Sequence, residues 1–372
     1  MINVGITGQN GFVGSHLYKT ISLFPDEFAL IDFQRSYFDD KNLLDQFVRQ
    51  CDVIIHLAAL NRHNDADQIY NVNTQLVEKL RAALEREKVA PHVIISSSTQ
   101  EERDNVYGKS KRAGREMLLG WAQQVDAKFT GLIIPNVFGP FGEPFYNSVV
   151  ATFCHQISRG EQPKIEVDGY LKLIYVGELV LEIIKVIRDG VNSPKLELAY
   201  TAEAKVSEIM QLLNDFKESY QDNGQIPSLK ERFEIQLFNT FRCYMDIKNY
   251  FPRKFIQHID NRGAFVEVIR LGIGGQVSYS TTVPGIIRGN HFHTRKIERF
   301  SVIKGKALIQ LRKIGTDDIL DFYLDGNEPS YVDMPIWYTH NIKNIGEDEL
   351  LTVFWINEHY DPNDPDTYFV PV

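Results

Sequence analysis

The chain has 372 residues, of which 43% are hydrophobic and 24% are charged, and its formal net charge at pH 7 is −9. This composition is typical of a soluble globular protein, and the length is sufficient for two domains. The acidic balance argues against nucleic acid or an anionic membrane surface as a partner, and no run approaches the roughly 18 apolar residues of a membrane-spanning helix.

The cysteines and the amino terminus indicate the compartment. Cys51, Cys154 and Cys243 are odd in number and widely spread, which fits a reduced protein better than a disulfide framework. Residues 1–7 contain neither a basic segment nor a small-residue cleavage site, so we expect no signal peptide. The protein is therefore expected to be cytoplasmic.

Residues 1–134 alternate short apolar runs with segments of helical periodicity. Each apolar run is nearly continuous, which is typical of a parallel sheet whose two faces are both covered by helices. This half is therefore predicted to be a Rossmann-like, doubly wound α/β domain. The expected strands are 2–7, 28–33, 51–57, 92–95 and 129–134, and the expected helices are 12–22, 68–89 and 107–124.

The pattern changes near Tyr250, after which short apolar runs are separated by Gly, Pro and Asn. These runs, with no amphipathic helix between them, predict an all-β sandwich or barrel. We place the domains at 1–246 and 247–372, and expect an ordered or partly ordered tail at 361–366. The expected strands are 265–270, 275–281, 299–303, 306–312, 319–324, 330–334 and 350–357.

A glycine-rich turn between the first strand and the first helix indicates a nucleotide site. Gly8, Gly11 and Gly14 would let the backbone approach a pyrophosphate, and the helix that begins at Phe12 and Val13 would point its free N–H groups at the phosphates. The spacing is G-x-x-G-x-x-G, and three glycines alone also fit an ordinary turn. The strand and helix on either side favour the cofactor interpretation.

Two residues after the second strand bear on which cofactor binds. Asp32 stands where a carboxylate would hold the adenosine ribose, and Arg35 stands where a guanidinium could bind a 2′-phosphate. Together they favour NADPH over NADH. The alternative, that Arg35 is only a solvated loop charge, stays open.

Tyr107 and Lys111 are four residues apart on an expected helix and therefore share a face. A phenol is a poor acid or base at pH 7, but a neighbouring ammonium and a bound nicotinamide ring would lower its pKa. Ser98, which ends the serine run after the fourth expected strand, could bind the same substrate oxygen. The three residues predict a proton-transfer site.

These motifs resemble those of the extended short-chain dehydrogenase/reductase family, most of whose members act on nucleotide sugars. The likeness rests on TGQNGFVG, HLAAL, SSS and YGKSK and covers about residues 1–245. It implies that Leu57, Ala58, Ala59 and Asn73 contribute to the cofactor site. The PNVFGP run, which contains Asn136, is similar to a substrate-side motif of that family.

Two features depart from that family. Only nine positions separate Ser98 from Tyr107, so the loop between them is shortened. Thr99 and Gln100 stand where the sugar 4,6-dehydratases would have an Asp-Glu pair, which argues against dehydration.

A second candidate site lies in the β-rich half, where the chain reads G-x5-H-x-H-x4-E-x6-G from 285 to 305. His291 and His293 alternate along an expected strand and would face the same way, Glu298 follows on the next strand, and His340 would supply a fourth ligand. Three imidazoles and a carboxylate suit Zn²⁺, Fe²⁺, Mn²⁺ or Ni²⁺. The spacing resembles the two motifs of the cupin family, although Trp337 stands where the second motif usually has glycine.

DNRGAF at 260–265, Glu267 and PGIIRGNHFH also resemble the dTDP-sugar 3,5-epimerases, which are metal-free cupins. In those enzymes the residue corresponding to His291 is the base, and one imidazole cannot be both a base and a metal ligand. Either a metal polarises the ketone or another group removes the proton. Tyr338 is a candidate acid or base, and the alternative is that it only packs in the mouth of the barrel.

Over its whole length the chain resembles the bifunctional capsular polysaccharide enzymes of the CapF type. That resemblance implies a homodimer with Zn²⁺ in the cupin that epimerises C3 of UDP-2-acetamido-2,6-dideoxy-L-arabino-4-hexulose and reduces C4 with NADPH. The product would be UDP-2-acetamido-2,6-dideoxy-L-talose, on the route to UDP-N-acetyl-L-fucosamine.

Two alternatives remain open. The chain could be a redox-neutral UDP-sugar 4-epimerase with a non-catalytic cupin that serves dimerisation. It could also be a non-catalytic binding or cofactor-sensing protein, which the complete set of Ser98, Tyr107 and Lys111 disfavours.

Overall fold

The structure is a computed structural model that describes residues 1–260, 263–266, 268–269, 271, 274–358 and 361–372. The chain divides into two compact units, one of Met1–Thr152 with Ile165–Val206 and the other of Phe153–Lys164 with Ser207–Val372. The domain boundary expected between 246 and 247 stays a prediction, whereas the compact units place 207–246 with the β-rich part. In the described part of the chain, none of the helices combines the length and apolar character needed to cross a membrane.

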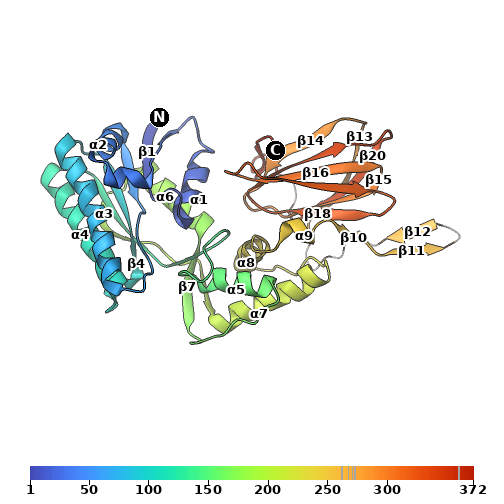
Figure 1. Cartoon of the computed structure of the whole chain (residues 1–372), viewed down its shortest axis with the longest axis horizontal. Helices are drawn as coiled ribbons and strands as arrows, with labels where there is room; N and C mark the ends of the chain where they lie inside the picture. The colour runs from blue at the N-terminus through green and yellow to red at the C-terminus, as the bar shows by residue number, and fades with distance from the viewer. Residues whose placement is uncertain (261–262, 267, 270, 272–273, 359–360) are drawn as a thin grey trace. The chain divides into compact units, whose positions relative to one another are not determined.

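The first unit contains a six-stranded sheet of order β2-β1-β3-β4-β5-β8, in which every pairing is parallel (Figure 1). The chain reverses its direction of travel across the sheet at β1, and ligands of such sheets bind at this switch point, beyond the carboxyl ends of the strands. The predicted Rossmann-like fold is confirmed. The strands are β1 (Ile2–Thr7), β2 (Phe28–Ile31), β3 (Val53–His56), β4 (His92–Ser98), β5 (Phe129–Ile134) and β8 (Ser193–Glu197).

Helices cover both faces of this sheet, as the continuous apolar strands require. Apolar side chains of α1 and α6 pack on one face, and those of α2, α3 and α4 pack on the other. The helices are α1 (Phe12–Ile21), α2 (Lys41–Gln50), α3 (Ala66–Glu87), α4 (Val106–Val125) and α6 (Val176–Asp189), with short helices η1 (Arg35–Asp39) and η2 (Thr99–Glu102). A small sheet joins β6 (Asn136–Phe138), β7 (Tyr170–Tyr175) and β9 (Ala202–Lys205), and α5 spans Val149–Ser158.

Helix α2 was not predicted, although its amino-terminal signal is present in the sequence. The Asp40 carboxylate accepts hydrogen bonds from the backbone N–H groups of Asn42 and Leu43, which satisfies two donors that the helix leaves without a partner. The next residues place Leu44, Phe47 and Val48 against the core at helical spacing. An Asp followed by this apolar pattern would have identified the helix.

The β-rich part of the second unit contains two five-stranded antiparallel sheets, in the orders β10-β18-β15-β20-β13 and β17-β16-β19-β14-β21 (Figure 1). Their apolar side chains form a common core that includes Val302, Ile309 and Val332. The predicted all-β architecture is confirmed. The strands are β10 (Arg253–Lys254), β13 (Gln276–Thr282), β14 (Ile287–Phe292), β15 (Glu298–Lys304), β16 (Lys306–Lys313), β17 (Ile319–Asp325), β18 (Ser330–Met334), β19 (Tyr338–Asn344), β20 (Leu350–Ile356) and β21 (Tyr368–Phe369).

One expected strand, 265–270, is only partly covered by the description. β11 (Gln257–Asp260) and β12 (Gly263–Val266) form an antiparallel hairpin, so the strand begins earlier than expected. Residues 267 and 270 lie outside the described residues, and the resemblance drawn from Glu267 lies there with them.

Helices that precede the predicted boundary pack against the sandwich through a buried polar network. Arg299 on β15 forms a bidentate ion pair with Asp333 on β18, with N–O distances of 2.8 and 3.0 Å. The Tyr220 hydroxyl donates to the same carboxylate at 2.5 Å, and Arg299 also donates to the carbonyl of Gly224. The helical segments before the boundary are α7 (Val206–Phe216), the π-helical turn η3 (Lys217–Asp222) and α8 (Arg232–Arg242), and α9 (Ile247–Tyr250) follows it.

Replacing Asp333 by alanine is expected to lower the free energy of unfolding of the β-rich unit by about 3–5 kcal/mol. The side chains of Asp333 and Arg299 are 0% and 2% exposed, so the substitution would leave a buried guanidinium without its counter-ion. Urea unfolding measures the change. Glu328→Gln is the matched control, because Glu328 pairs with Lys254 on the surface, and it is expected to cost less than about 1 kcal/mol. Equal effects of the two variants would contradict the role assigned to the network.

Candidate functional site

The glycine turn after β1 is tightly folded and depends on its glycines. Gly8 has φ of +80°, in the left-handed region that glycine favours, and a Cβ on Gly14 would lie 2.1 Å from the carbonyl oxygen of Gly8. Gly11 is the N-cap of α1 and has no side chain that could fold over the helix end, whose first residues are Phe12 and Val13. Helix α1 thus begins at the switch point of the sheet, and its amino-terminal N–H groups lie there.

Replacing Gly14 by alanine is expected to reduce dinucleotide affinity at least about tenfold and to destabilise the turn, since Cβ would displace the Gly8 carbonyl. Cofactor fluorescence titration and thermal unfolding measure the two effects. Gly120→Ala in α4 is the matched control: a Cβ there would meet no described heavy atom within 4 Å, and the helix should gain about 0.5–1 kcal/mol. Normal affinity in Gly14→Ala would show that the turn does not hold the cofactor.

The end of β2 is tied to the glycine turn by Gln9, which sequence reasoning missed. The Gln9 amide donates to Asp32 Oδ1 at 2.8 Å and accepts from the backbone N–H of Phe33. This arrangement holds Asp32 next to the turn, where its second oxygen can serve a ribose hydroxyl. Arg35 is exposed at the start of η1, so a 2′-phosphate could reach it from solvent.

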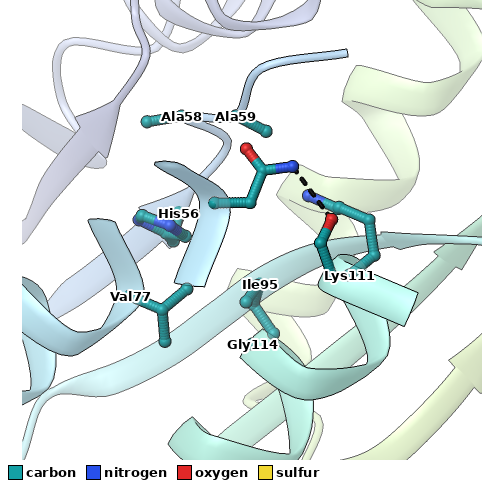
Figure 2. A pocket seen from close by; sticks show the side chains of 9 residues that line it. His56, Ala58, Ala59, Val77, Ile95, Lys111 and Gly114 are labelled. Atoms are coloured by element: carbon teal, nitrogen blue, oxygen red, sulfur yellow. Dashed lines mark hydrogen bonds between the residues drawn. The ribbon is translucent and has the colours of Figure 1, made fainter. Parts of the chain in front are cut away.

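A small pocket lies beside these elements, between the end of β3 and helix α4 (Figure 2). Lys111 extends from α4 toward the loop that carries Ala58 and Ala59. Leu57, just before them, donates its N–H to the carbonyl of Thr7 and so continues the pairing of β3 with β1. The lining residues are His56, Ala58, Ala59, Asn73, Val77, Ile95, Ser110, Lys111 and Gly114.

Asn73 is buried and its side chain holds the wall of this pocket together. Its carbonyl oxygen accepts from the N–H of Leu60 at 2.6 Å, and its amide donates to the carbonyl of Leu60 and to Ser110 Oγ. Asn73 therefore fixes the 58–61 loop against α4. Asn136, the expected substrate residue, is exposed at the start of β6.

Burial shifts the pKa values of Tyr107, Lys111 and His56. Burial raises the pKa of Tyr107 to about 12, and the nearby Tyr146 adds to this, so Tyr107 keeps its proton at neutral pH. Burial lowers the pKa of Lys111 to about 8, and its ammonium donates to Ser96 Oγ at 3.2 Å. Burial, with Lys111 nearby, lowers the pKa of His56 to about 3, so His56 is neutral. The expected lowering of the phenol pKa is not found, because burial raises the pKa of Tyr107.

The shortened loop between Ser98 and Tyr107 is possible because the backbone of η2 lies very close to the first turn of α4. A Cβ on Gly108 would lie 2.0 Å from the carbonyl oxygen of Gln100, so only glycine lets η2 pack on the start of α4. Ser98 Oγ caps η2 by accepting from the N–H of Gln100. Glu101 in η2 is buried and bound by Arg115 through two nitrogens, which makes it a structural carboxylate.

In the second unit, His291, His293, Glu298 and His340 form one cluster whose ligand atoms all lie within 4.8 Å of one another. The rings of His291 and His340 have centroids 4.5 Å apart, and His293 Nε2 lies 2.9 Å from Glu298 Oε2. A bulge between Gly289 and His291 shifts the register of β14 so that His291 stands opposite His340 on β19. The predicted ligand set is thus brought together.

The chemistry of the cluster fits a divalent cation. His340 is fully buried; its Nε2 lies 3.3 Å from Glu298 Oε2 but is not aligned to donate to it, and it has no hydrogen-bond partner among the described residues. An unsatisfied buried nitrogen is costly unless something else binds it. Burial, aided by the other imidazoles, lowers the pKa of His291 to about 4, which leaves this ring neutral and able to ligate.

Two details of this site differ from the expected pattern. β14 ends at Phe292, so His293 lies one residue past the strand rather than alternating along it, and its ring still comes to 5.0 Å from that of His291. Trp337 has φ of +62°, so it adopts the left-handed conformation that glycine favours, and it stacks on Phe292. Tyr338 begins β19 next to it, and burial raises the pKa of its hydroxyl.

Comparison with known proteins defines the family. The profile of the NAD dependent epimerase/dehydratase family matches residues 4–199, which is more than half of the chain. The chain belongs to this family. A second profile, that of the polysaccharide biosynthesis C-terminal domain, matches residues 258–368 of the chain.

Relatives of this family member match over its whole length. It is 32% identical over 372 residues to the UDP-2-acetamido-2,6-beta-L-arabino-hexul-4-ose reductase of Pseudomonas aeruginosa, covering 99% of this chain and 98% of the relative. The crystal structure of the capsular polysaccharide assembling protein CapF from Staphylococcus aureus matches with 33% identity, full coverage of both chains and a TM-score of 0.63. The predicted resemblance to the CapF type is confirmed.

A third comparison supports the fold of the first unit alone. The structure of RMD from Pseudomonas aeruginosa complexed with NADPH matches with 20% identity and a TM-score of 0.54, covering 59% of this chain and 83% of that one. At this level of identity the comparison bears on the Rossmann-like fold and on nothing further.

Proposed function

We propose that this protein is a bifunctional enzyme of UDP-sugar metabolism that works on UDP-2-acetamido-2,6-dideoxy-L-arabino-4-hexulose. The β-rich domain, proposed to be a cupin, epimerises C3, and the Rossmann-like domain reduces the C4 ketone with NADPH to UDP-2-acetamido-2,6-dideoxy-L-talose. The product would lead to UDP-N-acetyl-L-fucosamine for capsular or O-antigen polysaccharide. We further propose that the enzyme is a cytoplasmic homodimer.

The observation that carries this proposal is the full-length similarity to a relative named as a reductase of a 4-keto UDP-sugar. The similarity spans both the pocket around Lys111 and the cluster around His340, so the two sites belong to one functional chain. A 4-keto sugar also connects the two reactions chemically, because the ketone acidifies the hydrogen at C3 and is itself the group that is reduced.

For the epimerisation, His291, His293, Glu298 and His340 are proposed to hold one divalent cation, Zn²⁺ first among the candidates, which would polarise the C4 ketone as a Lewis acid. His291 then serves as a ligand and not as the base. Tyr338, which stands two residues before His340 on β19, is proposed as the acid or base that acts at C3.

For the reduction, NADPH bound at the glycine turn would supply the hydride. Tyr107, which holds its proton at neutral pH, is proposed to donate it to the oxygen that develops negative charge at C4. Lys111, with a pKa of about 8, is charged at neutral pH and would stabilise the tyrosinate left behind. Ser98 is proposed to bind the same oxygen of the substrate, and Asn136 another part of the sugar.

The test uses the full-length protein and the 4-keto UDP-sugar in deuterated water. Without NADPH, we expect deuterium to enter C3, as followed by mass spectrometry. With NADPH, one cofactor should be oxidised for each sugar reduced. No net oxidation of NADPH with the 4-keto sugar, together with interconversion of the C4 epimers of a UDP-sugar that carries a C4 hydroxyl, would instead support the redox-neutral 4-epimerase and reject the proposal.

A further inference from the structure

The carboxyl-terminal tail packs directly beside the histidine cluster. β21 pairs with β14 so that Phe369 stands opposite His291 and Tyr368 opposite Phe292. The rings of Tyr368 and Phe292 stack with centroids 5.3 Å apart. The tail is therefore part of the wall of the site.

Asp366 fastens this tail to the turn that follows His293. Its carboxylate accepts hydrogen bonds from the N–H groups of Thr294, Arg295 and Lys296 at 3.0–3.1 Å and from Thr294 Oγ1 at 2.6 Å. Only 3% of Asp366 is exposed. Several donors that converge on one buried carboxylate make a rigid connection, since each would otherwise be left unsatisfied.

The backbone of the same residue contacts a predicted metal ligand. The carbonyl oxygen of Asp366 accepts a hydrogen bond from His293 Nδ1, which therefore carries a proton. The other nitrogen of that ring, Nε2, faces Glu298 Oε2 at 2.9 Å inside the cluster. Asp366 thus determines which nitrogen of His293 is turned toward the cluster.

We propose that Asp366 is a positioning residue for the metal site: its carboxylate anchors the tail to the 294–296 turn, and its carbonyl orients His293 with Nε2 toward the cation. This inference rests on the metal site of the proposed function. Partners of this kind, outside the ligand set, fix the tautomer and the ring orientation, and their loss typically weakens metal affinity by about 10–100-fold.

Neighbouring contacts of the tail offer matched controls. Asp364 forms an ion pair with Arg295 at 2.8 Å and is 67% exposed, so it strengthens the docking of the tail from outside without reaching His293. Thr294 Oγ1 donates one of the hydrogen bonds to Asp366 and makes a milder change possible.

The experiment measures Zn²⁺ affinity of the full-length protein by competition with a chromogenic chelator. We expect Asp366→Ala to bind Zn²⁺ about 10–100-fold more weakly and Thr294→Val to show a smaller loss in the same direction. Asp366→Asn keeps the residue's tolerance for its φ of +40° but turns an amide donor toward backbone N–H groups, so it should behave like the alanine variant. Asp364→Ala should keep the wild-type affinity.

A spectroscopic measurement separates positioning from general destabilisation. The visible absorption of the Co²⁺-loaded protein reports the geometry of the ligands, and we expect it to change in Asp366→Ala and Asp366→Asn but not in Asp364→Ala. Circular dichroism checks that each variant is folded. If Asp366→Ala does not fold, Asp366→Asn and Thr294→Val decide the question.

Wild-type Zn²⁺ affinity and an unchanged Co²⁺ spectrum in the Asp366 variants would overturn the proposal, and so would an equal loss in Asp364→Ala. Failure of the metal site itself is distinguishable, because the wild-type protein would then bind neither Zn²⁺ nor Co²⁺. Both measurements are independent of which sugar the enzyme converts.

Discussion

Replacing Tyr107 by phenylalanine is expected to lower the rate of NADPH oxidation with the 4-keto UDP-sugar by about 10²–10⁴-fold. This is the usual contribution of a positioned general acid, and the substitution removes only the hydroxyl that would donate the proton. Burial raises the pKa of Tyr107 to about 12, so the hydroxyl of the wild-type residue keeps its proton across the neutral range. Stopped-flow measurement of the absorbance of NADPH gives the rate.

Deuterium exchange at C3 should remain at its wild-type rate in Tyr107→Phe, because that reaction is assigned to the other unit. Tyr18→Phe is the matched control, since Tyr18 packs at the edge of the first core cluster, and its rate of reduction should not change. Wild-type reduction by Tyr107→Phe would remove Tyr107 from its assigned role, whereas a simultaneous loss of C3 exchange would contradict the separation of the two sites.

Replacing His340 by glutamine is expected to abolish Zn²⁺ binding and to slow deuterium exchange at C3 by at least about 100-fold. His340 is fully buried and offers one of the four ligand atoms of the proposed metal site, so its loss would leave that site incomplete and less polarising. Lewis-acid polarisation of a carbonyl is worth several kcal/mol, and each 1.36 kcal/mol corresponds to about a factor of ten in rate. Metal analysis and mass spectrometry of the sugar measure the two effects.

Removing the metal from the wild-type protein with a chelator should reproduce this loss, and adding Zn²⁺ should restore exchange. NADPH binding is expected to stay unchanged in His340→Gln. His155→Gln, on α5, is the matched histidine control and should keep both metal and exchange. Undiminished exchange in the metal-free protein would show that the cluster is structural and that the base acts without a Lewis acid.

Much of the structure of the first unit could be predicted from local sequence patterns. The apolar run that forms β1, the three glycines and the helix that begins at Phe12 lie within 21 residues, so the order of residue types alone indicated their structure. The same holds for Tyr107 and Lys111, which share one face of α4. The side-chain network around Asn73 was not visible at that level, because it joins α3, the loop at Leu60 and Ser110 on α4.

In the β-rich unit, local sequence patterns identified the side chains of the cluster but not their geometry. The spacing of His291, His293 and Glu298 predicted ligands, but their geometry depends on the bulge before His291 and on the end of β14 at Phe292. The unit also includes helices that precede the expected boundary, since Tyr220 is bonded to Asp333 across 113 positions of the chain. A partner so far away in the chain cannot be predicted from the local periodicity of the sequence.

The amino-acid sequence by itself indicated the two architectures, the glycine turn, the candidate proton-transfer residues and the four side chains of the histidine cluster. Each depends on residue types and spacings within one element or between neighbouring elements, where steric rules and hydrophobic periodicity operate. The tertiary structure decided which distant segments meet: His340 opposite His291, and Asp366 against His293 from 73 positions away. Those contacts depend on strand register and on the burial of polar groups that must find partners, which are properties of the folded chain as a whole.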